Sequence, residues 1–134
     1  MTSSAYSSRQ GQPTHKTILI IEDDEAIGYF LTMAIQTETP YLPLLLSSGN
    51  QALQQIREKK PDLLLLDYHL PGINGIDLYD QLQATNEISN IPTILLTANT
   101  SRQMSSEAER RKLMILIKPL ELDDFLHLVG ELLA

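Results

Sequence analysis

The sequence contains no cysteine and no tryptophan, and only 5% of its 134 residues are aromatic. Without cysteine the chain has no disulfide framework and no thiolate metal site. No apolar run comes near the roughly 18 residues that a membrane-spanning helix needs, and the N-terminus lacks the basic start and apolar stretch of a secretory signal. These absences predict a cytoplasmic protein rather than a secreted or membrane-embedded one.

Positive charge is also scarce, because 10 Lys and Arg residues stand against 17 Asp and Glu residues, giving a formal net charge of -7. A domain with this charge repels phosphate backbones and anionic membrane surfaces. We therefore expect neither direct nucleic-acid binding nor membrane association. The hydrophobic fraction of 43% and the charged fraction of 20% are typical of a soluble globular protein with one ordinary core.

Residues 1–15 are rich in Ser, Gln and Gly and show no repeating apolar pattern, which predicts a disordered N-terminal tail. Residues 16–134 form the predicted folded domain. Short apolar runs without period-two alternation recur along it, and such runs are typical of strands covered on both faces. The five runs are Ile18–Ile21, Leu44–Leu46, Leu63–Leu66, Ile94–Leu96 and Met114–Ile117.

Helical patterns fill the intervals between these runs and supply the crossovers that parallel strand pairing requires. The regular alternation predicts an α/β fold of the (βα)5 kind with a five-stranded parallel sheet. The predicted helices are Ala26–Thr37, Asn50–Lys59, Ile76–Thr85, Ser101–Arg110 and Leu122–Leu133.

Polar side chains follow four of the predicted strands, at the carboxyl ends where open parallel sheets bind ligands. They are Glu22–Glu25, Asp67, Thr97 and Lys118. Carboxylates that converge at one edge repel each other and need either protonation or a cation between them. Oxygen ligands without a His or Cys cluster suit Mg²⁺. One carboxylate could then attack phosphorus while the Lys and Thr side chains hold the remaining phosphoryl oxygens.

Taken singly, each of these residues has a simpler explanation. Glu22–Glu25 could merely place negative charge at a helix N-terminus. A lone Asp after a strand is more often a turn former than a nucleophile. Thr97 could cap a helix, and Lys118-Pro119 is a common loop pair. Only their combination and order indicate a reaction site.

The combination resembles the receiver domain of response regulators over about Thr17 to Leu133. The resemblance rests on the stretches ILIIEDDE and LLLLDYHLPGINGID and on the pairs Thr97-Ala98 and Lys118-Pro119. Asp67 lies 44 positions after Asp23, Thr97 a further 30, and Lys118 a further 21. The resemblance implies a doubly wound, flavodoxin-like (βα)5 fold with strand order 2-1-3-4-5, and a role in two-component signalling.

The same resemblance implies that Asp67 is the phosphoacceptor and that the domain binds Mg²⁺. Asp23 and Asp67 would be direct metal ligands, Glu22 would act through a water, and the backbone carbonyl of His69 would complete the set. Asp24 is left as a neighbouring acid that could substitute for one of them.

By resemblance Thr97 would bond a phosphoryl oxygen, Lys118 would pair with the phosphate, and a cis peptide would precede Pro119. Two features depart from the family pattern. Ile115 stands where an aromatic residue is usual, and Arg111-Lys112 replace a small Gly-Ala turn. These departures predict that the catalytic groups are kept while the face from the fourth to the fifth helix is altered.

The predicted function is that of a stand-alone phosphoacceptor switch. Asp67 would take a phosphoryl group from a sensor histidine kinase or a His-phosphotransfer protein, and the aspartyl phosphate would shift a two-state equilibrium. Because only Ala134 follows Leu133, we expect the output to be the surface from the fourth to the fifth helix. A downstream protein or a second copy of the domain, forming a homodimer, would read it. We expect no enzymatic activity beyond phosphoryl uptake and autodephosphorylation.

Two other classes stay open at this point. A receiver-like adaptor would bind partners without phosphorylation, but it has no physical need for the acidic, Thr and Lys residues named above. A Mg²⁺-dependent phosphohydrolase with an aspartyl nucleophile typically carries Asp-x-Asp, whereas Tyr68-His69 follow Asp67. Turnover of a generic phosphate ester distinguishes this second class.

Overall fold

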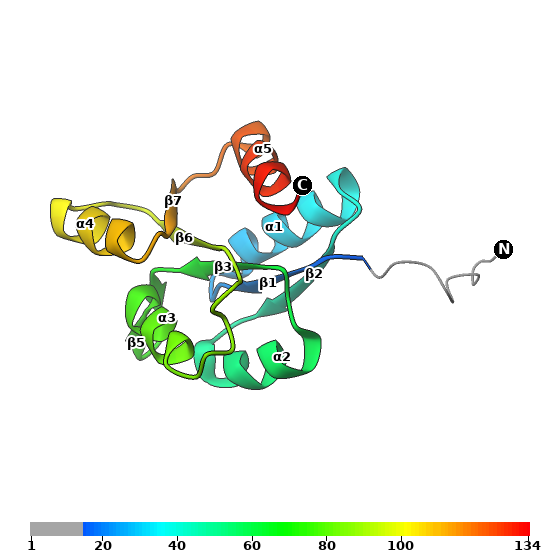
Figure 1. Ribbon diagram of the computed structural model, residues 1–134. Helices are drawn as coiled ribbons and strands as arrows, with labels where there is room; N and C mark the ends of the chain where they lie inside the picture. Colours follow the sequence, from blue (N-terminus) through cyan, green and yellow to red (C-terminus); the bar gives the residue numbers. More distant parts are fainter. Residues whose placement is uncertain (1–14) are drawn as a thin grey trace, which may run out of the picture.

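The computed structural model describes residues 15–134, so the predicted tail, except for His15, lies outside the described residues. A five-stranded sheet crosses the molecule in the order β2-β1-β3-β6-β7, with every neighbouring pair parallel (Figure 1). Counted along this sheet alone, the order is the predicted 2-1-3-4-5. The strands are β1 (Thr17–Ile21), β2 (Leu42–Leu46), β3 (Leu63–Asp67), β6 (Thr93–Thr97) and β7 (Met114–Ile117).

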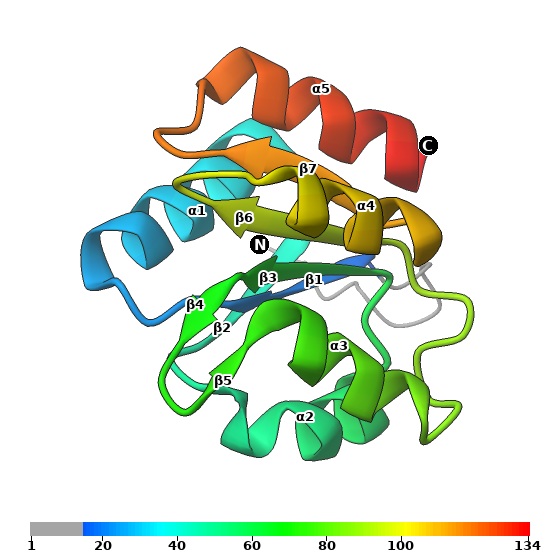
Figure 2. The same cartoon turned by 90° about the vertical axis from the view of Figure 1, so that its left-hand side faces the viewer.

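Helices cover both faces of the sheet, as Figure 2 shows with α1 and α5 on one side and α2 and α3 on the other. The predicted doubly wound α/β architecture is therefore confirmed. The helices are α1 (Glu25–Glu38), α2 (Ala52–Lys59), α3 (Gly75–Gln83), α4 (Arg102–Arg110) and α5 (Leu122–Leu133), and a short 3-10 turn, η2 (Gly49–Gln51), precedes α2.

The sheet separates two apolar cores because successive side chains of a strand point to opposite faces. Leu64 and Leu66 of β3 contact the core under α2, α3 and α4. Leu63 and Leu65 contact the core under α1 and α5. All four are fully buried, and each such burial stabilises the fold by roughly 1.5–3 kcal/mol. The unbroken apolar runs thus reflect strands that are covered on both sides.

Helix boundaries differ from the predicted ones by one to two residues, and capping explains most of the shifts. Asp24 caps α1 through a bond from the Ile27 amide, so the helix begins at Glu25. Ser101 caps α4 in the same way and is not itself helical. The second helix was predicted from Asn50, but its start is a 3-10 turn. Only α5 has its predicted limits.

A small feature in the loop after β3 was not predicted. Strands β4 (His69–Leu70) and β5 (Ile73–Asn74) form a two-stranded antiparallel pair before α3. With only two residues each, such strands leave no periodic signal in a sequence. Across residues 15–134, no helix is both long and apolar enough to cross a membrane.

Candidate functional site

Strand ends bring the predicted site residues to one edge of the sheet. Asp67 is the last residue of β3 and Thr97 the last of β6, and Glu22 and Lys118 directly follow β1 and β7. The backbone continues in register beyond the last strand, since the amide of Lys118 donates to the carbonyl of Thr97 at 2.8 Å. Parallel strands that end together place these four residues at the edge where such sheets bind ligands.

Lys118 connects the two buried carboxylates. Its Nζ lies 3.0 Å from Asp67 Oδ1 and 2.9 Å from Glu22 Oε1. Both acidic residues are 2% exposed, so their charges are shielded from water. The peptide bond between Lys118 and Pro119 is cis, which confirms the expectation drawn from the family resemblance. The site therefore holds two carboxylates and one ammonium group in a volume that is almost inaccessible to water.

Burial acts in opposite directions on the acid and the base. It raises the pKa of Glu22 from 4.5 to about 7, with the neighbouring Asp67 carboxyl adding to the rise. For Lys118 burial by itself would lower the pKa, but the carboxylates of Glu22 and Asp67 outweigh it and raise the pKa above its ordinary value. Lys118 therefore stays charged, while Glu22 is easily protonated.

Three carboxylates form a cluster suited to a hard cation. One oxygen from each of Glu22, Asp23 and Asp67 lies within 4.8 Å of the other two. Glu22 Oε1 is buried and makes no hydrogen bond within residues 15–134, although the Lys118 ammonium lies beside it. An oxygen-only set of this kind fits Mg²⁺, which takes few protein ligands and keeps several waters.

The Asp24 side chain caps a helix, whereas Glu22 and Asp23 belong to the acidic cluster. Its Oδ1 accepts a hydrogen bond from the Ile27 amide at 2.9 Å, and its own amide donates to Glu22 Oε2 at 3.0 Å. Asp24 therefore caps α1 and orients the Glu22 carboxylate. We did not predict this support for Glu22, although an Asp directly before a helix is a recognisable cap signal.

The loop after Asp67 passes very close to the end of β3. The amide of His69 donates to Asp67 Oδ1 at 3.3 Å, and the amide of Gly75 donates to the Tyr68 carbonyl at 2.7 Å. A Cβ atom at position 75 would lie 2.6 Å from the Asp67 carbonyl oxygen, a distance that no side chain tolerates. Glycine is required here by close backbone approach, so that α3 can begin against the site.

Thr97 is fully buried, and its hydroxyl is held by its own loop. Oγ1 donates to the Asn99 carbonyl at 2.6 Å and accepts from the Asn99 amide at 3.3 Å. Beside it, Ala98 helps to line an apolar hollow of about 520 Å³ that also reaches Lys118 and Phe30. The small side chain of Ala98 leaves the Lys118 side of the site open.

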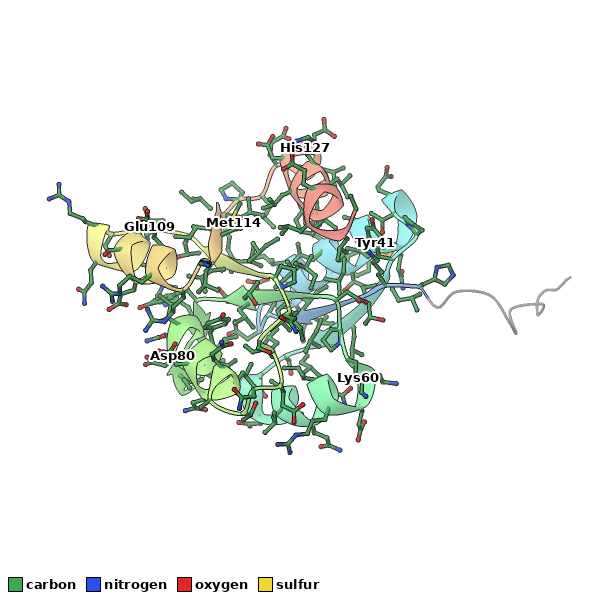
Figure 3. All side chains as sticks on the ribbon, viewed as in Figure 1. Tyr41, Lys60, Asp80, Glu109, Met114 and His127 are labelled. Atoms are coloured by element: carbon green, nitrogen blue, oxygen red, sulfur yellow. The ribbon has the colours of Figure 1, made fainter. Side chains whose placement is uncertain are left out.

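Two histidine side chains, those of His69 and His127, are exposed and contact neighbouring side chains. That of His69 is exposed and meets Tyr68 edge-on, with the ring centroids 4.9 Å apart. His127 projects from the outer side of α5 (Figure 3), where its Nε2 lies 3.3 Å from Glu131 Oε2.

The sequence profile of the response regulator receiver domain matches residues 18–130. The chain belongs to this family. Curated relatives include the DNA-binding response regulator MtrA of Mycobacterium tuberculosis, 41% identical over 83 residues that make up 62% of this chain and 35% of that protein. The phosphate regulon regulator PhoB of Rhizobium meliloti is 37% identical over 81 residues, 60% of this chain and 35% of PhoB. The match therefore spans about a third of the length of each relative.

Solved structures agree with the family and with the fold. The receiver domain of the Francisella response regulator 1452 superposes with a TM-score of 0.78 at 25% identity, covering 88% of this chain and 96% of that one. The chemotaxis protein CheY4 of Vibrio cholerae has a TM-score of 0.81 over 89% of this chain and 99% of its own. Its identity is 18%, so that likeness bears on the fold alone.

Receiver domains are signalling switches and are generally not enzymes, and the chain belongs to this class. Ile115 and Arg111, which depart from the family pattern, both contact other parts of the fold. Ile115 is half-buried and packs on the core beneath α4. Arg111 makes a bidentate ion pair with Asp80 of α3, a contact that sequence reasoning missed because the two residues lie 31 positions apart.

Proposed function

We propose that this receiver domain accepts a phosphoryl group on Asp67 from a phosphohistidine of a sensor histidine kinase or a His-phosphotransfer protein. The observation that carries the proposal is the Lys118 ammonium shared between Asp67 and Glu22 at the edge of the sheet. A structural ion pair needs only one of these carboxylates. Two buried carboxylates and one cation leave a net negative charge that a divalent metal would compensate.

In this proposal Mg²⁺ would be held directly by the carboxylates of Asp23 and Asp67 and by the backbone carbonyl of His69, and through a water by the carboxylate of Glu22. When bound, the ion neutralises charge on the phosphoryl oxygens and so lets a carboxylate approach phosphorus. The closeness of the three carboxylates supports this ligand set.

The protein side chains then have distinct tasks. An Asp67 oxygen attacks phosphorus as the bond from phosphorus to the donor imidazole nitrogen breaks, and the imidazole leaves. Lys118 releases its contact with the Asp67 carboxylate and pairs with a phosphoryl oxygen, a charge-assisted bond. Thr97 turns its hydroxyl from the Asn99 carbonyl toward a phosphoryl oxygen, which changes the loop that leads into α4.

We infer that the resulting change is read on the face from α4 to α5 by a downstream protein or by a second copy of the domain. The net charge of -7 favours a protein partner over direct contact with nucleic acid or an anionic membrane. MtrA is a DNA-binding response regulator, yet the matched part of it is about a third of its length. We also infer that residues 16–134 form the switch unit and that it works in the cytoplasm.

The test is the intact mass of the protein after incubation with acetyl phosphate or phosphoramidate and Mg²⁺. We expect a gain of one phosphoryl group that is lost without the metal and in Asp67→Ala. Asp123→Ala, which removes an exposed acid of α5, is the matched control and should still gain the group.

Absence of any gain with either donor would favour a phosphorylation-independent adaptor. Steady turnover of a generic phosphate ester would instead favour a phosphohydrolase.

A further inference from the structure

Helix α4 is embedded less deeply than the other helices of the same core. Of its nine residues, Ala108 is the buried one, and Met104 is half-buried. Helix α5 on the opposite face buries Phe125, Val129 and Leu133. Because local stability follows the number of buried apolar contacts, α4 is a segment whose position depends on its polar attachments.

The strongest polar attachment lies at the C-terminal end of α4. Arg111 Nε lies 2.7 Å from Asp80 Oδ1 and Arg111 Nη2 lies 2.8 Å from Asp80 Oδ2, so the pair is bidentate. The remaining nitrogen, Nη1, donates to the Glu107 carbonyl at 2.8 Å. One planar guanidinium therefore joins the side chain of α3 to the last turn of α4. In Figure 3, Asp80 on α3 and Glu109 on α4 lie on the same side of the molecule.

Electrostatics supports the pair from both partners. The guanidinium of Arg111 holds the pKa of the Asp80 carboxyl below its ordinary value, and Asp80 raises the pKa of Arg111. The Arg111 side chain is 24% exposed, and its fork geometry matches a carboxylate better than a lysine would. The chain then passes directly into β7, since the buried Leu113 donates its amide to the Ala108 carbonyl at 2.9 Å.

The N-terminal end of α4 has no comparable attachment in the described part of the chain. Ala98, Asn99 and Thr100, which link β6 to the helix, are all exposed. The cap there is local, with Ser101 accepting a bond from the Met104 amide at 3.0 Å. One end of α4 is thus fixed to α3, while the other follows a loop that begins at Thr97.

We propose that the Arg111–Asp80 pair is a pivot that fixes the C-terminal end of α4, so that movement of this helix is confined to its first turn. Arg111 stands where the family usually has a small turn. With this end fixed, the loop after Thr97 is the part of the output face that can move. Only the trigger of the movement, phosphorylation at Asp67, rests on the function proposed above.

The first experiment measures amide hydrogen exchange in the unphosphorylated, metal-free protein by NMR. In the native protein the amides of Glu109–Arg111 should exchange more slowly than those of Ser105 and Ser106. Arg111→Ala should speed exchange at Glu109–Arg111 by about fivefold and remove this gradient. Arg111→Lys, which keeps the charge but loses the fork, should behave like Arg111→Ala.

The matched control is Arg57→Ala, which removes another Arg–carboxylate pair, the single contact of Arg57 Nε with Glu87 Oε1 at 3.0 Å. This change should leave exchange in α4 unaltered. Asp80→Ala and the double variant Asp80→Ala/Arg111→Ala complete a cycle in which the double variant should be no worse than Arg111→Ala alone. If a variant does not fold, Asp80→Asn is the milder replacement in the same cycle.

A second experiment repeats the exchange with acetyl phosphate and Mg²⁺. In the native protein the changes should stay within the first turn of α4, and in Arg111→Ala they should extend through the helix. Additive effects in the cycle, or native changes of equal size along α4, would overturn the pivot. Failure to take up phosphate would sink the proposed function, whereas the first experiment would still decide whether the pair holds the helix.

Discussion

Lys118 Nζ lies 3.0 Å from Asp67 Oδ1, although the two residues are 51 positions apart in the chain. The contact exists because β3 and β7, with β6 between them, end at the same edge of the sheet. Glu22 joins from β1 on the other side of β3, so three strands contribute to one charged group. The site therefore forms only when the sheet is complete. Its charges affect the stability of the fold as well as its chemistry.

Loss of the shared cation should destabilise the metal-free protein. Lys118→Ala leaves two buried carboxylates without a partner, and such uncompensated charges cost about 3 kcal/mol in the free energy of unfolding. Urea unfolding at neutral pH measures this, with the exposed Lys59→Ala as the control. Addition of Mg²⁺ should recover part of the loss, because the ion replaces the missing positive charge. Equal stability of Lys118→Ala and the native protein would show that the carboxylates are not held in a dry environment.

The raised pKa of Glu22 gives metal-free stability a distinctive dependence on pH. In the unfolded chain this carboxyl titrates near 4.5, and in the folded protein near 7. Between these values the folded state binds the extra proton, so the contribution of Glu22 to stability is full below about pH 4.5 and is lost as the pH rises to about 7. Removal of the charge should reverse this loss.

Glu22→Gln should therefore be more stable than the native protein at pH 8 without metal, by on the order of 1–3 kcal/mol. Denaturant unfolding at pH 5 and at pH 8 tests this, with Glu109→Gln as an exposed control. The same variant should bind Mg²⁺ more weakly, because it lacks one anionic oxygen. A stability difference that is the same at both pH values would contradict the raised pKa.

Sequence patterns were sufficient for the fold because the five apolar runs are themselves the strands. Leu63–Leu66 is buried on both faces of the sheet, so every position in this stretch is apolar. The site was predictable for a related reason, since its residues are the ones at which those runs end. Contacts that no period specifies were not predictable. Arg111 and Asp80 are both charged helix residues, and only the packing of α3 against α4 brings them together.

The same distinction applies at the level of single side chains. The sequence marked Thr97 and Glu22 as candidate site residues, but it could not show that the Thr97 hydroxyl bonds the Asn99 carbonyl or that the Asp24 amide orients Glu22. These bonds depend on loop dihedral angles, which follow from tertiary packing rather than from residue type. The β4–β5 pair escaped prediction because its strands are too short to show alternation.

Phosphorylation should produce only small changes in the NMR signals of α4. By resemblance to the family, the aromatic side chain usual at position 115 rotates together with the threonine, and we expect the half-buried Ile115 to couple less strongly to Thr97. Thr97→Ala, which removes the hydroxyl bonded to Asn99, should shift the α4 amide signals to a similar small extent. A large phosphorylation-induced rearrangement of α4 would count against this weak coupling.

The lifetime of the aspartyl phosphate should depend on two side chains beside the site. His69 and Asn99 lie two positions after Asp67 and Thr97, and both are exposed at the mouth of the site. We predict that each limits the access of the hydrolytic water, so His69→Ala and Asn99→Ala should dephosphorylate faster. Loss of phosphoryl mass over time measures the rate, and His127→Ala is the control for a distant exposed histidine. Unchanged rates in both variants would refute the idea.

Lys112 adopts a left-handed backbone conformation with φ of 61°, immediately after the residue that caps α4. A side chain in this region costs about 1 kcal/mol that glycine avoids, while glycine gives back part of that gain through its freer unfolded chain. Lys112→Gly should therefore raise the free energy of unfolding by about 0.5–1 kcal/mol, and Lys112→Ala, which keeps the strain, should give no such gain. Because the Arg111 guanidinium is untouched, exchange in the last turn of α4 should not quicken. Lower stability of Lys112→Gly would mean that the lysine side chain itself holds the turn.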